Sequence, residues 1–167
     1  GGTVIVNEDA FEERNLEKAG YLDAGGTPVN PLDDNTLNGY RVLKVPMSSL
    51  TKKVCEPLGV KPRDAERSKN FFALGLVSWM YTRPTEPTEE WIHEKFGKNE
   101  KVAAANKAAF QAGFNFGETT EAVGHRFEVR PAQLPAGEYT SITGNTALSW
   151  GLIAAGQQAD LPLTLGS

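Results

Sequence analysis

The sequence is poor in the residues that build metal centres and disulfides. It holds one cysteine, Cys55, and two histidines, His93 and His125, among 167 residues. One thiol cannot form an internal disulfide or hold an iron–sulfur cluster, and the two histidines are too far apart in sequence for a paired zinc motif. The sequence therefore predicts no metal site on this chain. The single cysteine is also typical of a reducing compartment, so we expect a cytoplasmic protein.

Long apolar runs and an excess of basic charge are missing too. No run approaches the roughly 20 apolar residues that span a bilayer, and the N-terminus lacks the basic and apolar regions of a signal peptide. Seventeen basic residues against 21 acidic ones give a formal charge of −4. This balance provides no attraction to nucleic acid or to an anionic membrane, so we expect neither as a partner.

Common catalytic and nucleotide-binding motifs are absent as well. No Gly-x-Gly-x-x-Gly or Walker sequence supplies a phosphate cradle, and no Gly-x-Ser-x-Gly elbow presents a nucleophilic serine. The paired carboxylates at 33–34 and 89–90 fall in a predicted loop and at a predicted helix start, where solvation or the helix dipole explains them. The motifs therefore identify no catalytic residue.

The segments at the start of the chain indicate an α/β fold. Short apolar runs at residues 3–6 and 40–45 predict two strands. Between them, Asp9 can cap a helix that ends near Ala19. Residues 21–39 are dense in turn-forming residues, which predicts a long surface loop that is either functional or mobile.

Apolar periodicity predicts a series of helices after the second strand. The first begins at Ser48 or Ser49 and carries Cys55 on its apolar stripe, as a small core residue. The charged segment 61–70 then precedes a run at 71–80 that is apolar on nearly every face, which predicts a helix covered on all sides.

Two further helices complete this part of the chain. One begins at Thr88, with acidic residues in its first turn. The other runs from Glu100 to about Gln111, with Gly113 and Gly117 ending the helical region.

The composition changes near residues 118–138, which predicts a linker between two units. Beyond it, an apolar helix begins at Asn145 or Thr146. Period-two alternation predicts strands at residues 125–130 and 161–165, and residues 139–143 are a further candidate strand.

One basic cluster is a candidate anion site. Arg63, Arg67 and Lys69 stand ahead of the apolar helix, whose N-terminus can receive an anionic ligand. A solvated charged turn, capped by Ser68 or Asn70, explains the same residues. Both interpretations stay open at this level.

Two stretches add a family resemblance. Residues 67–76 (RSKNFFALGL) and 105–117 (ANKAAFQAGFNFG) resemble the γ domain of 2-oxoacid:ferredoxin oxidoreductase α subunits. Residues 142–156 and 161–167 are similar to the opening of the pyrimidine-binding domain in the same fused subunit. The resemblance covers nearly the whole chain in the expected order and is closest to the 2-oxoglutarate branch.

The resemblance implies an internal piece of a larger polypeptide. The family's Gly-rich strand–loop–helix would precede Gly1, and its Tyr-Pro-Ile-Thr-Pro substrate loop would follow Ser167. The implied fold is a partial open sheet flanked by helices, followed by a linker and the first helix and strand of a second α/β domain. The implied boundaries are 1–117 for the C-terminal part of the Rossmann-like γ domain, 118–138 for the linker and 139–167 for the pyrimidine-binding domain.

The resemblance also implies a function for the intact enzyme. The family decarboxylates a 2-oxoacid oxidatively on thiamine diphosphate with Mg²⁺ and transfers the acyl group to coenzyme A. Electrons pass through a [4Fe–4S] cluster in the β subunit to ferredoxin, so the implied partners are that β subunit, in a hetero-oligomer, and ferredoxin. None of the family's catalytic positions maps onto this chain, which is therefore expected to bind no cofactor alone and to be inactive alone.

Four residues are the candidate contacts that the resemblance implies. Arg67, Lys69 and Asn70 would lie near coenzyme A, because the γ domain covers the active site. Asn145 would order the first helix beside the cofactor pocket, or would simply cap that helix. An alternative class remains: a free-standing, non-catalytic interaction module of the same fold, which would require natural chain ends at Gly1 and Ser167.

Overall fold

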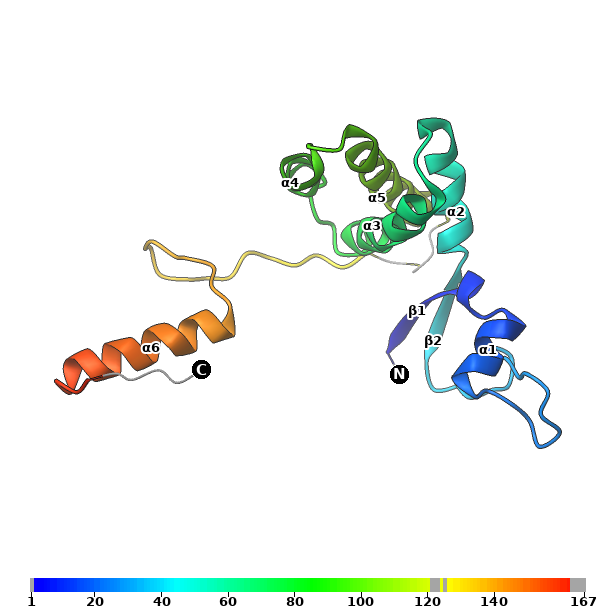
Figure 1. Cartoon of the computed structure of the whole chain (residues 1–167), viewed down its shortest axis with the longest axis horizontal. Coiled ribbons are helices and arrows are strands. Elements are labelled where there is room, and N and C mark those ends of the chain that lie inside the picture. The colour runs from blue at the N-terminus through cyan, green and yellow to red at the C-terminus, as the bar shows by residue number, and fades with distance from the viewer. Residues whose placement is uncertain (1, 121–123, 125, 163–167) are drawn as a thin grey trace. The chain divides into compact units, whose positions relative to one another are not determined.

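Two parallel strands open the fold in the computed structural model, which describes residues 2–120, 124 and 126–162 (Figure 1). Strand β1 spans Thr3–Asn7 and strand β2 spans Arg41–Val45. Thr3 pairs with Arg41 and Asn7 with Val45, so both strands end at the same edge of the sheet. Helices accompany this short sheet, which confirms the predicted α/β class with a partial open sheet flanked by helices.

The connection between the strands contains helix α1, Glu13–Ala19, which ends at Gly20 in a left-handed conformation (φ 76°). The helix starts later than the sequence predicts. Asp9 lies in a short 3₁₀ turn, Glu8–Ala10, and its carboxylate accepts hydrogen bonds from Ser49 instead of capping α1. The capping residue is therefore used by a helix 40 positions further along the chain.

Four helices follow β2 among the described residues of the first unit. They are α2 at Met47–Cys55, α3 at Pro62–Met80, α4 at Glu86–Phe96 and α5 at Glu100–Thr120, with a 3₁₀ turn, Glu56–Leu58, after α2. Cys55 is 1% exposed, which confirms its prediction as a core residue, and burial raises the pKa of its thiol. The main core gathers residues of β2, α2, α3 and α5, namely Val45, Met47, Phe72, Leu76, Trp79, Met80 and Ala109.

Helix α3 is longer than the apolar run that predicts it. Pro62 occupies the first helical turn, where its missing N–H costs no hydrogen bond, so the charged segment 61–70 is helical almost throughout. The apolar run is also not covered on all sides. Leu74 and Val77 remain 41% and 39% exposed.

Helix α5 continues through both glycines that were expected to end it. A Cβ at Gly113 would lie 1.9 Å from the carbonyl oxygen of Phe72, and a Cβ at Gly117 would lie 2.6 Å from the Trp79 ring. These glycines therefore allow α5 to approach α3 closely, and helical packing outweighs their weak helix propensity.

Helices α3 and α5 run parallel. Near their starts, Ser68 contacts Asn106, and near their ends Trp79 packs against Gly117. Both pairs are separated by the same 38 residues in the sequence, so the register between the helices is constant. Helix α4 lies in the connection between them and packs beside α5 (Figure 1).

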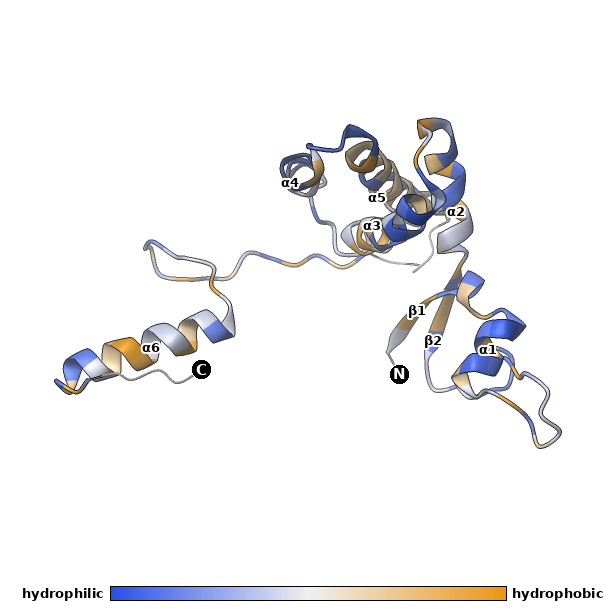
Figure 2. Cartoon of the chain, viewed as in Figure 1, coloured by the Kyte–Doolittle hydropathy of each residue, from blue (hydrophilic) through white to orange (hydrophobic). Residues whose placement is uncertain are grey.

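A second compact unit spans Pro131–Ser167, whereas the first spans Gly1–Arg130. Its helix α6, Gly144–Gln158, is capped by Thr143, whose Oγ1 accepts from the Thr146 amide at 3.2 Å. Helix α6 buries none of its residues, although much of it is apolar (Figure 2).

Two of the three strands predicted for the C-terminal region are not formed in the described residues. Residues 126–130 and 139–143 form no strand, and most of the predicted strand at 161–165 lies outside the described residues. The boundaries 1–117, 118–138 and 139–167 stay predictions. No described helix has the length and apolar character needed to cross a membrane.

Candidate functional site

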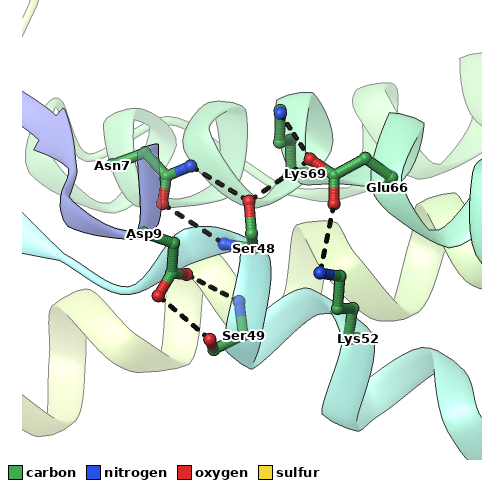
Figure 3. Close-up of polar contacts among 7 residues, drawn as sticks. All are labelled: Asn7, Asp9, Ser48, Ser49, Lys52, Glu66 and Lys69. Atoms are coloured by element: carbon green, nitrogen blue, oxygen red, sulfur yellow. Dashed lines mark hydrogen bonds and ion pairs between the residues drawn. The ribbon is translucent and has the colours of Figure 1, made fainter. Parts of the chain in front are cut away.

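The carboxyl edge of the sheet is the natural place to look for a site, because ligands of open α/β sheets bind beyond the carboxyl ends of the strands. At this edge β1 ends in Asn7, and β2 leads directly into α2 (Figure 3). The Asn7 side chain donates from Nδ2 to Ser48 Oγ at 3.0 Å and accepts at Oδ1 from the Ser48 amide at 3.3 Å. Asp9 accepts from the Ser49 amide at 2.7 Å and from Ser49 Oγ at 3.0 Å.

This network continues onto α3 through Glu66. Ser48 Oγ donates to Glu66 Oε1 at 3.4 Å, and Lys69 Nζ binds the same oxygen at 2.6 Å. Lys52 Nζ lies 3.7 Å from the other carboxylate oxygen. The hydrogen bond from Lys69 and the charges of Lys69 and Lys52 lower the pKa of Glu66, so its carboxylate stays ionised at neutral pH.

The contacts at this edge hold β1, α2 and α3 together and make the edge a poor binding site for a phosphate group. Asn7 and Asp9 already accept from the first amides of α2, the groups that would otherwise bind an anion. The ammonium of Lys69 is already paired with Glu66. An anionic ligand would have to displace the side chains of Asn7 and Asp9 and break the ion pair between Lys69 and Glu66.

The three predicted contacts on α3 do not lie together. Lys69 is half-buried in the network with Glu66, whereas Arg67 and Asn70 are exposed. All three lie in the second and third turns of α3, so they are not at its N-terminus. Of the basic cluster predicted as an anion site, Arg63 is exposed in the first turn of α3, whereas Arg67 and Lys69 lie further along the helix.

Arg67 and Asn70 belong to one exposed stripe of α3. The stripe repeats at intervals of three and four residues and continues with Leu74, Val77 and Tyr81. It is therefore polar near the start of the helix and apolar near its end. Within the described part of the chain Arg67 has no ion-pair partner, so its guanidinium is available to an anion.

Asn145 is exposed in the first turn of α6. Its backbone carbonyl accepts from Ser149 Oγ at 2.9 Å. Because Thr143 supplies the capping oxygen, Asn145 is not the cap of this helix.

Sequence reasoning missed the residues that the structure brings together at the sheet edge. Asn7 closes the first strand, and Ser48 lies just after the second. Since parallel strands end at a common edge, polar residues directly after two successive strands are a usable signal. Glu66 carries no such signal, because its position depends on how α3 packs against α2.

Metal chemistry has no support among the residues that the structure describes. No group of three or more His, Cys, Asp or Glu side chains there could hold a metal ion. The single cysteine, which is buried, also cannot hold an iron–sulfur cluster.

Comparison with known proteins identifies the class. Residues 1–116 match the family described as pyruvate ferredoxin/flavodoxin oxidoreductase, and the chain belongs to this family. Over all 167 of its residues the chain is 50% identical to the 2-oxoglutarate oxidoreductase subunit KorA of Mycobacterium tuberculosis. It spans 25% of the length of that relative. No solved structure matches the chain.

Proposed function

We propose that this chain is part of the α subunit of a 2-oxoacid:ferredoxin oxidoreductase that acts on 2-oxoglutarate and forms the acyl-coenzyme A product. The observation that carries the proposal is the 50% identity to KorA over the whole chain, together with the family match over residues 1–116. Residues 1–117 would be the C-terminal part of the γ domain, 118–138 the linker, and 139–167 the start of the pyrimidine-binding domain.

The cofactors would be held elsewhere in the assembled enzyme. When bound, thiamine diphosphate with Mg²⁺ supplies carbanion stabilisation for decarboxylation, and a [4Fe–4S] cluster in the β subunit supplies one-electron transfer to ferredoxin. This chain offers one cysteine, which is buried in the core with a raised thiol pKa, so it is a poor cluster ligand.

The chain's own contribution would be to bind and orient coenzyme A. Arg67 offers a planar guanidinium that can bind a phosphate group through two hydrogen bonds, and Asn70 adds an exposed amide on the same stripe. Lys69 would act indirectly, because its pairing with Glu66 holds α3 against α2. Asn145 would order the start of α6 beside the cofactor pocket.

The test uses the complete natural polypeptide that contains this sequence, purified with its partner subunit. We expect reduction of ferredoxin, or of a viologen dye, that depends on both 2-oxoglutarate and coenzyme A and is slower with pyruvate. The 167-residue chain alone is expected to show no such activity. An assembled pair that reduces neither acceptor with any 2-oxoacid would rule out the enzyme and favour a non-catalytic interaction module.

A further inference from the structure

A groove between α4 and α5 is separate from the sheet edge and from the exposed stripe of α3. Its volume is about 790 Å³. Ile92, which is 1% exposed, lies at its base with the small residues Gly97, Ala103 and Ala104. Small side chains along the floor leave room for an apolar side chain from another molecule.

The rim of the groove is acidic. Three glutamates of α4 repeat at intervals of four, Glu86, Glu90 and Glu94, so they form one row along the helix at steps of about 6 Å. Glu100 of α5 adds a fourth carboxylate. Figure 2 shows α4 largely hydrophilic beside the more apolar α5.

One further glutamate in the groove already binds other side chains of this chain. Glu89 pairs with Lys107 of α5 at 2.8 Å and accepts from Gln111 at 2.9 Å. The four rim glutamates form no ion pair within the described ranges.

The groove carries a net negative charge. Five glutamates and one lysine line the groove, which gives 1 − 5 = −4, equal to the formal charge of the entire chain. This local excess of negative charge would attract a cationic partner to the groove.

We propose that this groove binds a basic amphipathic helix of a partner protein, one whose Lys or Arg residues repeat at four-residue spacing beside a row of apolar side chains. The apolar row would enter the floor, and the cations would face the row of glutamates on α4. This mode places a helix in an apolar groove and uses the charged rim to select partner and orientation. It is independent of the activity proposed above.

The probe for the test is a synthetic amphipathic peptide with lysines at four-residue spacing beside a leucine row. Its control has the same composition in a scrambled order that breaks the amphipathic face. Binding is measured by titration calorimetry to the complete natural polypeptide with its partner subunit, at low and high salt. We expect the amphipathic peptide to bind at least about tenfold more tightly than the scrambled one, with an affinity that falls as salt rises.

Two groove variants and one matched control locate the binding. The double variant Glu90→Lys/Glu94→Lys is expected to weaken binding about tenfold or more, because it reverses two rim charges. Ala104→Trp keeps the charge but fills the floor, and we expect it to weaken binding about fivefold or more. Glu17→Lys/Glu138→Lys changes the net charge equally at exposed positions outside the groove and should change the affinity less than about twofold.

Several outcomes would overturn the proposal. Equal binding of the scrambled peptide, or equal loss in the control variant, would show attraction by net charge alone. Unchanged binding to Ala104→Trp, with folding verified by circular dichroism, would exclude the groove floor. No binding to the complete protein would mean that its own remaining parts, or a second copy, cover the groove.

Discussion

Ser68 of α3 and Asn106 of α5 meet inside the interface between the two longest helices. The serine hydroxyl donates to Asn106 Oδ1 at 2.7 Å, and the two residues are 1% and 4% exposed. A polar pair in this position fixes the helices at one register, since a buried amide oxygen without a donor is costly.

Ser68→Ala tests this pair. The variant leaves Asn106 Oδ1 buried without its donor, and we expect the free energy of unfolding to fall by about 1 to 3 kcal/mol, measured by urea denaturation. In the double variant Ser68→Ala/Asn106→Leu both polar groups are gone, so most of the loss should be recovered. A double variant less stable than Ser68→Ala would contradict the role of the hydrogen bond.

Gly113→Ala tests the close approach of α5 to α3. The added methyl would lie 1.9 Å from the Phe72 carbonyl oxygen, so the helices must move apart, at a cost of about 1 to 3 kcal/mol or more. The matched control is Gly39→Ala, because nothing lies within 4 Å of a Cβ at that position. If thermal unfolding shows equal loss in both variants, the helix contact is not the cause.

The ionised state of Glu66 predicts a pH-dependent contribution to stability. Its pKa is lowered below the ordinary value of 4.5 chiefly by the hydrogen bond from Lys69, so the unfolded chain takes up the proton more readily than the folded one. The stabilisation is therefore full above pH 4.5 and is lost as the pH falls through the lowered value. Because 40% of the side chain is exposed, solvent screening limits the effect to about 1 kcal/mol or less.

The variant Glu66→Gln should lower the free energy of unfolding at pH 7, and its difference from the parent chain should shrink in acid. Urea denaturation across this pH range measures both effects. Glu17→Gln on α1 serves as the control. A constant difference between Glu66→Gln and the parent at every pH would show that packing, and not charge, is responsible.

Arg67→Ala tests the proposed contact with coenzyme A in the assembled enzyme. Losing one guanidinium–phosphate interaction should raise KM for coenzyme A about tenfold, with kcat and KM for 2-oxoglutarate unchanged. Arg14→Ala on α1 is the matched control. A fall in kcat without a change in KM for coenzyme A would contradict a binding role for Arg67.

The parts of the fold that depend on local pattern could be predicted. Both strands follow from short apolar runs bounded by turn residues, and Cys55 follows from its place on an apolar stripe. The continuation of α5 through Gly113 could not, because only the nearby α3 backbone explains that glycine. The predicted strand at 139–143 failed for a similar reason, since a strand requires a pairing partner that its own sequence does not reveal.

In the candidate site, too, some features follow from local sequence and others depend on tertiary packing. Arg67, Lys69 and Asn70 are all predicted as contacts near coenzyme A, but residues that are close in a helical sequence need not share a face. The structure therefore turns Lys69 toward Glu66 and leaves Arg67 and Asn70 exposed. Asn7 meets Ser48 because the two parallel strands end at one edge, whereas Glu66 reaches Ser48 only through the packing of α3 against α2, which local sequence does not encode.

The constant 38-residue register between α3 and α5 has a consequence for how relatives of this chain can diverge in length. A residue inserted within either helix would rotate the following turns by about 100° and separate Trp79 from Gly117 while Ser68 still faces Asn106. Residues added between Met80 and Glu100 leave both helices intact and change only the crossover that contains α4. Insertions and deletions should therefore concentrate in that crossover and be rare inside the helix pair.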